Sequence, residues 1–141
     1  MAKLRHVVLA TKDPDATAEF YKQAFDFKEV RRTDSDLATG VFLSDGTLNI
    51  AVLNFKTDQL GRGMDYVGLH HIGVVVEDLE QTGKKLEALG APCFMGKPEK
   101  PTGFFEVKHR GPDGVVIDIS DHPWVGSAGL EDAPAEAAAK A

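Results

Sequence analysis

The chain contains two similar halves, and this internal repeat constrains its fold more than any other feature. In each half, an apolar segment with a histidine, His6 or His71, is followed by an acidic turn, at Asp13 or Asp78, and then by a helical pattern; equivalent residues lie 65 positions apart. This spacing is longer than the periods of about 20 to 50 residues that are typical of solenoids. The repeat therefore predicts two related modules, which can direct equivalent side chains into one shared cavity.

The hydrophobic pattern predicts the same order of elements in both halves: a strand, a helix and three further strands. Asp13 is a favourable N-cap and Pro14 a favourable first helical residue. In the first half, the expected elements are a strand at 4–11, a helix from residue 14, and strands at about 27–33, 37–44 and 47–54. In the second half, they are a strand at 69–76, a helix at 79–89, and strands near 91–95, 103–109 and 114–120.

These elements predict an α+β fold in which two tandem βαβββ modules form curled mixed sheets around a shared cavity. The expected boundaries are 1–54 for the first module, 55–68 for a linker with several glycines, 69–124 for the second module and 125–141 for a disordered tail. The tail is expected because large apolar side chains are rare there, so it cannot bury enough surface to fold.

Composition narrows the functional classes. A net charge of −6 argues against a nucleic-acid partner, because phosphate binding requires clustered Lys and Arg. One cysteine, Cys93, excludes an intrachain disulfide, and the first residues lack the apolar run of a signal peptide. No apolar segment approaches the roughly 20 residues that span a bilayer. We therefore expect a cytoplasmic protein that acts on neither nucleic acid nor membrane.

His6, His71 and Asp118 form a candidate metal site. Residues alternate between the two faces of a strand, and the module helices should cover the bulkier faces, so both imidazoles are expected to point into the concave side. Asp118, on the last predicted strand, shares this direction, and a carboxylate inside a sheet is costly unless it is paired or bound to a metal. Two imidazoles and one carboxylate leave coordination positions open. Fe(II), Mn(II), Ni(II), Co(II) and Zn(II) all accept this set.

Glu106 is a candidate general base. Phe105 and Val107 suit a face covered by a helix, which turns Glu106 and Lys108 toward the cavity if the strand is regular. Burial would raise the pKa of Glu106 toward the range that is useful for removing a proton next to a carbonyl. The alternative is an exposed edge strand on which these charges are solvated.

The other polar and aromatic candidates have simpler expected places. His70 has the opposite direction to His71 and is expected at the surface or on the helix side, with a supporting role for the metal ligand as the alternative. His109 and His122 lie near strand ends, where solvation is the default. Trp124 is a candidate for the cavity rim, although structural packing is the favoured interpretation.

The repeated βαβββ module, with a histidine in each first strand, resembles the vicinal-oxygen-chelate superfamily. The resemblance rests also on Asp13-Pro14 and Asp78-Leu79 before the helices and on the sequence GPDGVVID at 111–118, and it spans residues 4–124. The superfamily includes glyoxalase I, methylmalonyl-CoA epimerase, extradiol dioxygenases, fosfomycin-resistance proteins and bleomycin-binding proteins.

The resemblance implies that the histidine that opens a module and the acid that closes it bind a metal, here His6, His71 and Asp118. The chain departs from the pattern in two places. Asp118 stands where the closing acid is usually a Glu with one more methylene. The closing strand of the first module has Asn49 and Ala51 where glyoxalase I places a Glu and the epimerase a Gln, and either residue can take that position.

Three functional classes follow for a protein whose partner is a small oxygen-rich molecule. The favoured one is a metal-dependent lyase or isomerase of the glyoxalase I type, which transfers a proton next to a carbonyl bound to the metal. The alternatives are an Fe(II) extradiol-type dioxygenase and an antibiotic-resistance protein that binds or modifies its ligand. A homodimer is expected because sheet edges tend to be paired or protected. The two modules can pair within one chain or between two chains.

Overall fold

The computed structural model describes residues 2–99 and 105–127. The first module contains β1 (Lys3–Ala10), α1 (Pro14–Phe25), β2 (Lys28–Asp34), β3 (Ala38–Ser44) and β4 (Asn49–Phe55). The second contains β5 (Gly68–Val75), α2 (Leu79–Ala88), β6 (Cys93–Met95), β7 (Val107–Arg110), the short 3-10 helix η1 (Pro112–Gly114) and β8 (Val116–Ser120). The predicted order of elements and the α+β fold class are therefore confirmed.

The two modules share a single curled sheet with the strand order β2-β3-β4-β1-β5-β8-β7-β6. Within each module the first and last strands pair in parallel, as β1 with β4 and β5 with β8. The antiparallel pair of β1 and β5 joins the modules at the centre. In this structure, both modules of one chain thus complete the sheet.

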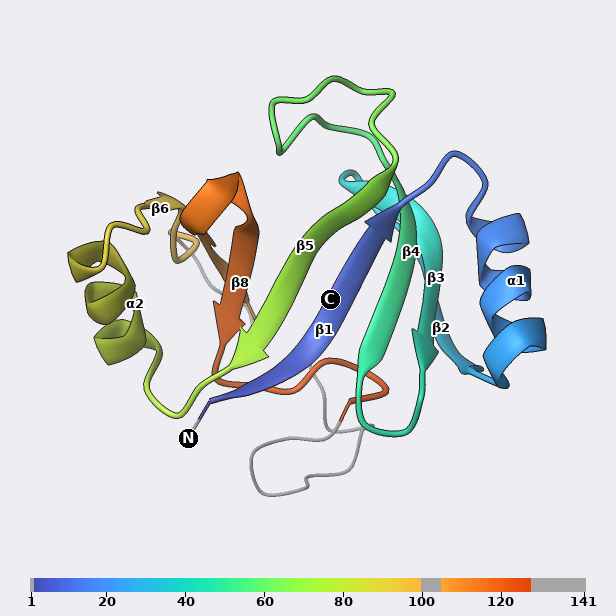
Figure 1. Cartoon of the computed structure of the whole chain (residues 1–141), viewed down its shortest axis with the longest axis horizontal. Helices are drawn as coiled ribbons and strands as arrows, with labels where there is room; N and C mark the ends of the chain where they lie inside the picture. The colour runs from blue at the N-terminus through green and yellow to red at the C-terminus, as the bar shows by residue number, and fades with distance from the viewer. Residues whose placement is uncertain (1, 100–104, 128–141) are drawn as a thin grey trace.

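The helices begin in the same way in both modules and flank the sheet at opposite ends (Figure 1). The side chain of Asp13 accepts a hydrogen bond from the amide of Ala16, and Asp78 accepts one from Gln81. These N-caps satisfy amide groups that a helix cannot pair internally. No helix in the described part of the chain is long and apolar enough to cross a membrane.

The sheet of the first module separates two apolar clusters. The cluster on the α1 side contains Ala18, Val41, Leu43 and Val52, and the cluster on the concave side contains Val8, Ala38, Phe42, Ala51 and Leu53. Alternation along the strands divides the residues between the two faces. The concave side is therefore partly filled with apolar side chains, and its remaining space is where the candidate site lies.

Two β-bulges interrupt the central strand pair, one in each strand, and the one in β5 lies next to a candidate metal ligand. Val8 is opposite His71, whereas the next residue, Leu9, is opposite Leu69, so His70 is the extra residue of β5. A bulge changes the direction of the side chains around it and breaks strict alternation. The prediction that His70 faces the surface or a helix is wrong for this reason: His70 is buried, with 7% of its surface exposed.

Two further predictions need correction. The sequence predicts Glu106 inside a strand at 103–109, but the observed strand β7 begins at Val107, so Glu106 precedes it; residues 103 and 104 lie outside the described part. The predicted tail does not begin at residue 125. The carbonyl of Val125 accepts a hydrogen bond from Asn49, and that of Gly126 accepts one from Ser44, so residues 125–127 pack on the first module. The rest of the predicted tail, 128–141, lies outside the described residues.

Candidate metal centre

His6 and His71 meet at the centre of the concave side, as the repeat predicts. Their Nε2 atoms are 3.1 Å apart and both side chains are buried. Space for the ring of His6 comes from Gly73, its partner on β5, because a Cβ at that position would lie 2.6 Å from the Cβ of His6. A glycine in the middle of a strand often marks such a close approach.

Both imidazoles are neutral in this environment. Burial lowers the pKa of His6 from 6.5 to about 3, and it lowers the pKa of His71 well below its usual value. A neutral imidazole has one nitrogen lone pair that is free to bind a metal ion. Both side chains are therefore in the protonation state that a metal ligand needs.

Asp118 presents one oxygen to the histidines and the other to a lysine. Its carboxylate is fully buried, and Oδ1 accepts a hydrogen bond of 2.5 Å from Nζ of Lys108. Oδ2 lies 2.9 Å from Nε2 of His71 and has no hydrogen-bond partner among the described residues. A buried carboxylate oxygen without a partner is costly. A cation beside the two Nε2 atoms would satisfy it.

Glu106 completes the group of polar side chains. One of its oxygens accepts a hydrogen bond of 3.1 Å from the indole nitrogen of Trp124, and the other lies 3.7 Å from Nζ of Lys108. Burial, together with the neighbouring carboxylate of Asp118, raises the pKa of Glu106 to about 7. Glu106 therefore lies on the concave side next to the histidines, not on an exposed, solvated edge.

Lys108 remains a cation despite its burial. Burial by itself lowers the pKa of an ammonium group, but here the carboxylates of Asp118 and Glu106 outweigh this effect and raise it. The positive charge of Lys108 compensates the negative charge of Asp118 in the interior. Lys108 lines the cavity, as strand alternation predicts, but the sequence pattern indicates no role for it.

The donor set fits a divalent transition metal. His6, His71, Glu106 and Asp118 each offer one ligand atom, and these atoms all lie within 4.8 Å of one another. Nitrogen and carboxylate oxygen donors suit Fe(II), Mn(II), Co(II), Ni(II) and Zn(II) alike. The partnerless Oδ2 of Asp118 faces the two Nε2 atoms, so the predicted set of His6, His71 and Asp118 can act together, with Glu106 as the nearest further donor.

Strand register identifies the fourth position of the repeat. Val8 of β1 is paired with Ala51, and its repeat equivalent, Gly73 of β5, is paired with Asp118. Ala51 therefore occupies the position that corresponds to Asp118, and its methyl group cannot bind a metal. Asn49 lies opposite His6 but uses its side-chain amide to hold the carbonyl of Val125.

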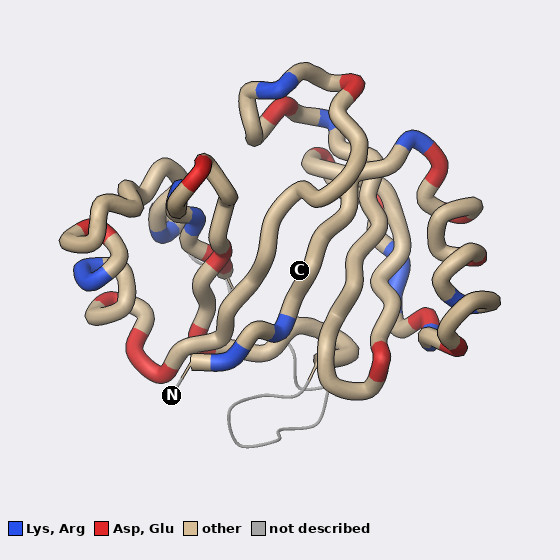
Figure 2. The backbone as a smooth tube through the Cα atoms, viewed as in Figure 1, with Lys and Arg blue, Asp and Glu red and all other residues tan. Residues whose placement is uncertain are grey.

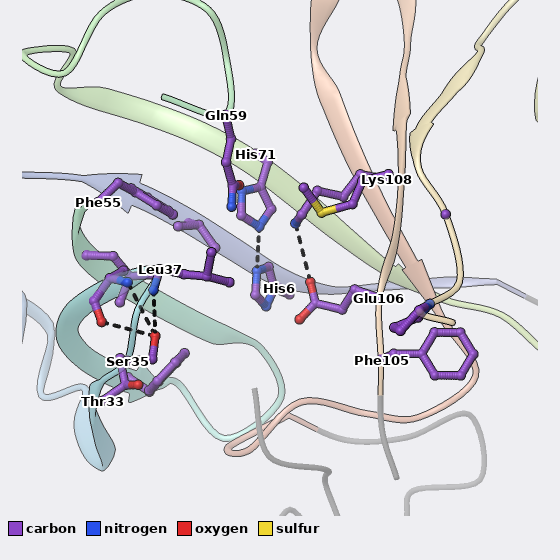
Figure 3. A pocket seen from close by; sticks show the side chains of 17 residues that line it. His6, Thr33, Ser35, Leu37, Phe55, Gln59, His71, Phe105, Glu106 and Lys108 are labelled. Atoms are coloured by element: carbon purple, nitrogen blue, oxygen red, sulfur yellow. Dashed lines mark hydrogen bonds and ion pairs between the residues drawn. The ribbon is translucent and has the colours of Figure 1, made fainter. Parts of the chain in front are cut away.

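A cavity of about 290 Å³ opens above this group (Figure 3). His6, His71, Glu106 and Lys108 lie at its polar end. Its other walls are mainly apolar and include Leu37, Phe42, Leu53, Phe55, Met95 and Phe105. Among the described residues that line the cavity, Lys108 is the one with a cationic side chain. The space suits a small molecule with a polar head and an apolar body.

Trp124 has the structural packing role that the sequence favours, whereas His109 differs from its expected place. Trp124 is fully buried, with its ring 4.7 Å from that of His6, so it packs beneath the site. His109 is also buried, and its Nδ1 pairs with the carbonyl of Ala91. His122, in contrast, is exposed, with 54% of its side-chain surface accessible. Position near a strand end does not distinguish these histidines, because burial depends on what packs over the strand.

Comparison with known proteins gives matches along most of the chain. The family model described as Glyoxalase/Bleomycin resistance protein/Dioxygenase superfamily matches residues 3–119. A probable chloroplastic lactoylglutathione lyase of Arabidopsis thaliana is 28% identical over 130 residues. That match covers 78% of this chain and 36% of the plant protein, so the chain spans about a third of the length of this curated relative.

Solved structures share the fold at low sequence identity. A hypothetical protein of Bacillus halodurans has a TM-score of 0.68 and 20% identity, over 84% of this chain and 93% of that chain. A methylmalonyl-CoA epimerase variant of Streptomyces coelicolor, in complex with 2-nitronate-propionyl-CoA, has a TM-score of 0.67 and 18% identity, over 84% of this chain and 95% of that chain. The methylmalonyl-CoA epimerase of Mycobacterium tuberculosis has a TM-score of 0.65 and 18% identity, over 83% of this chain and 85% of that chain. The likeness concerns the fold.

Proposed function

Because this chain belongs to the glyoxalase/bleomycin resistance protein/dioxygenase superfamily, we propose that it is a metal-dependent lyase or isomerase that transfers a proton next to a carbonyl of a small molecule. The observation that carries the proposal is Glu106, a largely buried carboxylate whose pKa is about 7. It lines the polar end of the cavity with His6 and His71 and lies close to Asp118.

His6, His71 and Asp118 would hold the divalent ion. Bound there, the ion supplies Lewis-acid stabilisation to negative charge that develops on substrate oxygens. The two histidines come from the paired central strands and Asp118 from β8, so the ligands rest on rigid elements of the sheet. Trp124 packs against the ring of His6 and limits its movement.

Glu106 would act as the general base. Its carboxylate takes the proton from the substrate carbon next to the carbonyl and returns it to the same or the neighbouring carbon. A base with a pKa near the working pH is efficient in both directions. The hydrogen bond from Trp124 holds one carboxylate oxygen and leaves the other on the side of Lys108.

The cavity walls point to the type of substrate. An apolar body fits against Leu37, Phe42 and Phe55, and the oxygen-bearing part fits at the polar end near Glu106 and Lys108. Suitable first assays are the reactions of the relatives, with lactoylglutathione and methylmalonyl-CoA. We expect the protein to act in the cytoplasm, where Cys93 stays a free thiol.

The first test of the proposal is the metal content. We expect one divalent ion per chain in protein purified without chelator and measured by elemental mass spectrometry. His71→Ala should lose this ion and keep the fold, because a catalytic site contributes less to folding than a structural zinc site. His122→Ala, at an exposed histidine, is the matched control and should keep full occupancy. Full occupancy in His71→Ala would overturn the assignment.

The second test is the replacement Glu106→Gln, which keeps the shape and removes the proton acceptor. General-base catalysis is typically worth a factor of about 10² to 10⁴ in rate. On a substrate that the wild type turns over, kcat should therefore decrease by a factor in this range. The metal content should not change. Glu80→Gln, at an exposed side chain on α2, is the control. A loss of less than about threefold in Glu106→Gln would exclude it as the base.

A dioxygenase is the second candidate, favoured by one observation. Two histidines and one carboxylate, His6, His71 and Asp118, match the ligand set of non-haem Fe(II) oxygenases. Iron in the purified protein, with oxygen-dependent cleavage of a catechol ring, would favour this function. Zn, Ni, Co or Mn without oxygen consumption would favour proton transfer. Protein that binds no metal would favour an antibiotic-resistance binding protein.

A further inference from the structure

His70 and His71 are neighbours in sequence whose rings also meet in space. Nδ1 of His70 lies 2.7 Å from Nδ1 of His71, and both side chains are buried. This contact exists because His70 is the extra residue of the β-bulge, which turns its side chain toward that of its neighbour. His70 does not line the large cavity, and its hydrogen-bond contact with the candidate site is the one to His71.

The contact between the two rings requires that one ring donates a proton. Two nitrogens at 2.7 Å form a hydrogen bond when one carries a hydrogen and the other has a lone pair. His71 directs Nε2 toward His6 and Asp118, where a metal ligand needs a lone pair. The hydrogen of a neutral His71 then lies on Nδ1 and is donated to Nδ1 of His70.

We propose that His70 is a positioning residue that accepts this hydrogen bond, holds the tautomer of His71 and thereby presents the Nε2 lone pair of His71 to a divalent metal ion. Metal-binding histidines almost always donate their other ring N–H to a neighbour that fixes the ring orientation. That neighbour is usually a carboxylate, a backbone carbonyl or water. Here the acceptor is a second histidine from the adjacent position of the same strand.

The surroundings of His70 hold its ring in place. Its ring stacks on Phe55, with centroids 3.8 Å apart and planes at 10°. Its other side borders a small cavity of about 20 Å³, whose walls include Asp58 and Tyr66. This volume is about that of one water molecule. The stack fixes the plane of the ring, so that Nδ1 faces His71 while the Nε2–H of His70 is left for the small cavity.

The inference rests on the proposed metal site, but its first test needs no metal. In the ¹⁵N-labelled wild type with chelator, long-range ¹H–¹⁵N spectra at neutral pH report which ring nitrogen carries the hydrogen. We expect Nδ1–H for His71 and Nε2–H for His70. A proton on Nε2 of His71 would overturn the proposal without any variant. A merely structural role for His70 predicts no particular tautomer of His71.

The second test measures Co(II) affinity by absorption, in competition with a chelating dye. His70→Phe keeps an aromatic ring on Phe55 and removes the acceptor, so we expect 10- to 100-fold weaker binding, the usual effect of losing such a partner. His70→Asn places an amide oxygen where Nδ1 was and should recover most of the affinity. His122→Ala is the control and should bind as the wild type does.

The outcomes separate this inference from the proposed function. A wild type that binds no Co(II) contradicts the metal site, while the tautomer of His71 still decides the role of His70. Wild-type affinity in a folded His70→Phe would overturn the role of His70 and leave the metal site in place. Equally weak binding in His70→Phe and His70→Asn would also count against it, because the hydrogen-bond acceptor would then not be the cause.

Discussion

At the scale of single residues, the candidate site is a group of charges that largely compensate one another. Asp118 and Lys108 form an ion pair of 2.5 Å in the interior, and His6 and His71 stay neutral. Glu106 holds a proton up to about pH 7. Without an ion the site is thus close to neutral, which lowers the cost of burying it. Binding of a divalent ion favours the ionised form of Glu106.

The buried histidines make the metal-free protein sensitive to acid. His6 and His70 have pKa values of about 3 and 4, both lowered mainly by burial from 6.5. As the pH falls below 6.5, the unfolded chain takes up protons that the folded chain does not, so stability decreases. Glu106 acts in the opposite direction, because its pKa is raised from 4.5 to about 7 and its contribution is lost as the pH rises between these values.

With chelator present, we expect a lower urea midpoint at pH 5 than at pH 7, because several histidines outweigh one glutamate. Glu106→Gln removes the group that acts in the opposite direction, so the difference between the urea midpoints at pH 5 and pH 7 should become larger in this variant. Circular dichroism during urea unfolding measures both. Equal midpoints at the two pH values, or a smaller difference in Glu106→Gln, would contradict the pKa shifts.

At the scale of elements, the same strand order is used for different purposes in the two modules. In both, the last strand lies parallel to the first, which brings Asp118 and Ala51 to equivalent positions. Only the second module has an acid there. Both central strands have a bulge at the equivalent residue, Arg5 in β1 and His70 in β5, but in β5 this residue is a histidine that contacts His71. The repeat gives both modules the same arrangement of strands, and residue differences between the modules produce a single shared site.

Along the chain, the segment after β8 returns to the first module. Trp124 packs on His6 and bonds to Glu106, while Val125 and Gly126 bond to Asn49 and Ser44. This segment therefore links the end of the second module to the first strand of the first. Composition alone does not show this, because small residues can be buried as easily as they can be solvated.

At the scale of the whole molecule, the two ends and the centre of the sheet differ in charge. Figure 2 shows Lys, Arg, Asp and Glu mainly on helices, loops and outer strands, while most of β1 and β5 carries no charge. Leu4 and Leu69, on these central strands, have 46% and 49% of their surfaces exposed. α1 packs on β3 and β4, and α2 on β8, so the helices leave the outer face of the centre open.

We expect this open face to be buried in a homodimer, because exposed apolar side chains between charged borders are typical of interfaces. Light scattering at micromolar concentration should give about twice the chain mass of 15.2 kDa. Leu69→Lys, which puts a charge on the open face, should give the monomer mass, while Leu89→Lys, at an exposed residue at the end of α2, should not. A wild-type mass of one chain would contradict the dimer.

The sequence by itself determined the repeat, the order of elements and the inward direction of His6, His71 and Asp118, because these follow from local hydrophobic periods and alternation. Only the tertiary structure decided the role of His70, the place of Trp124 and the equivalence of Ala51 with Asp118. Each depends on pairing between distant strands: a bulge adds one residue to one strand, and register aligns positions that are far apart in the chain. No local sequence pattern indicates the bulge or the register, because both depend on which strands pair and at which residues.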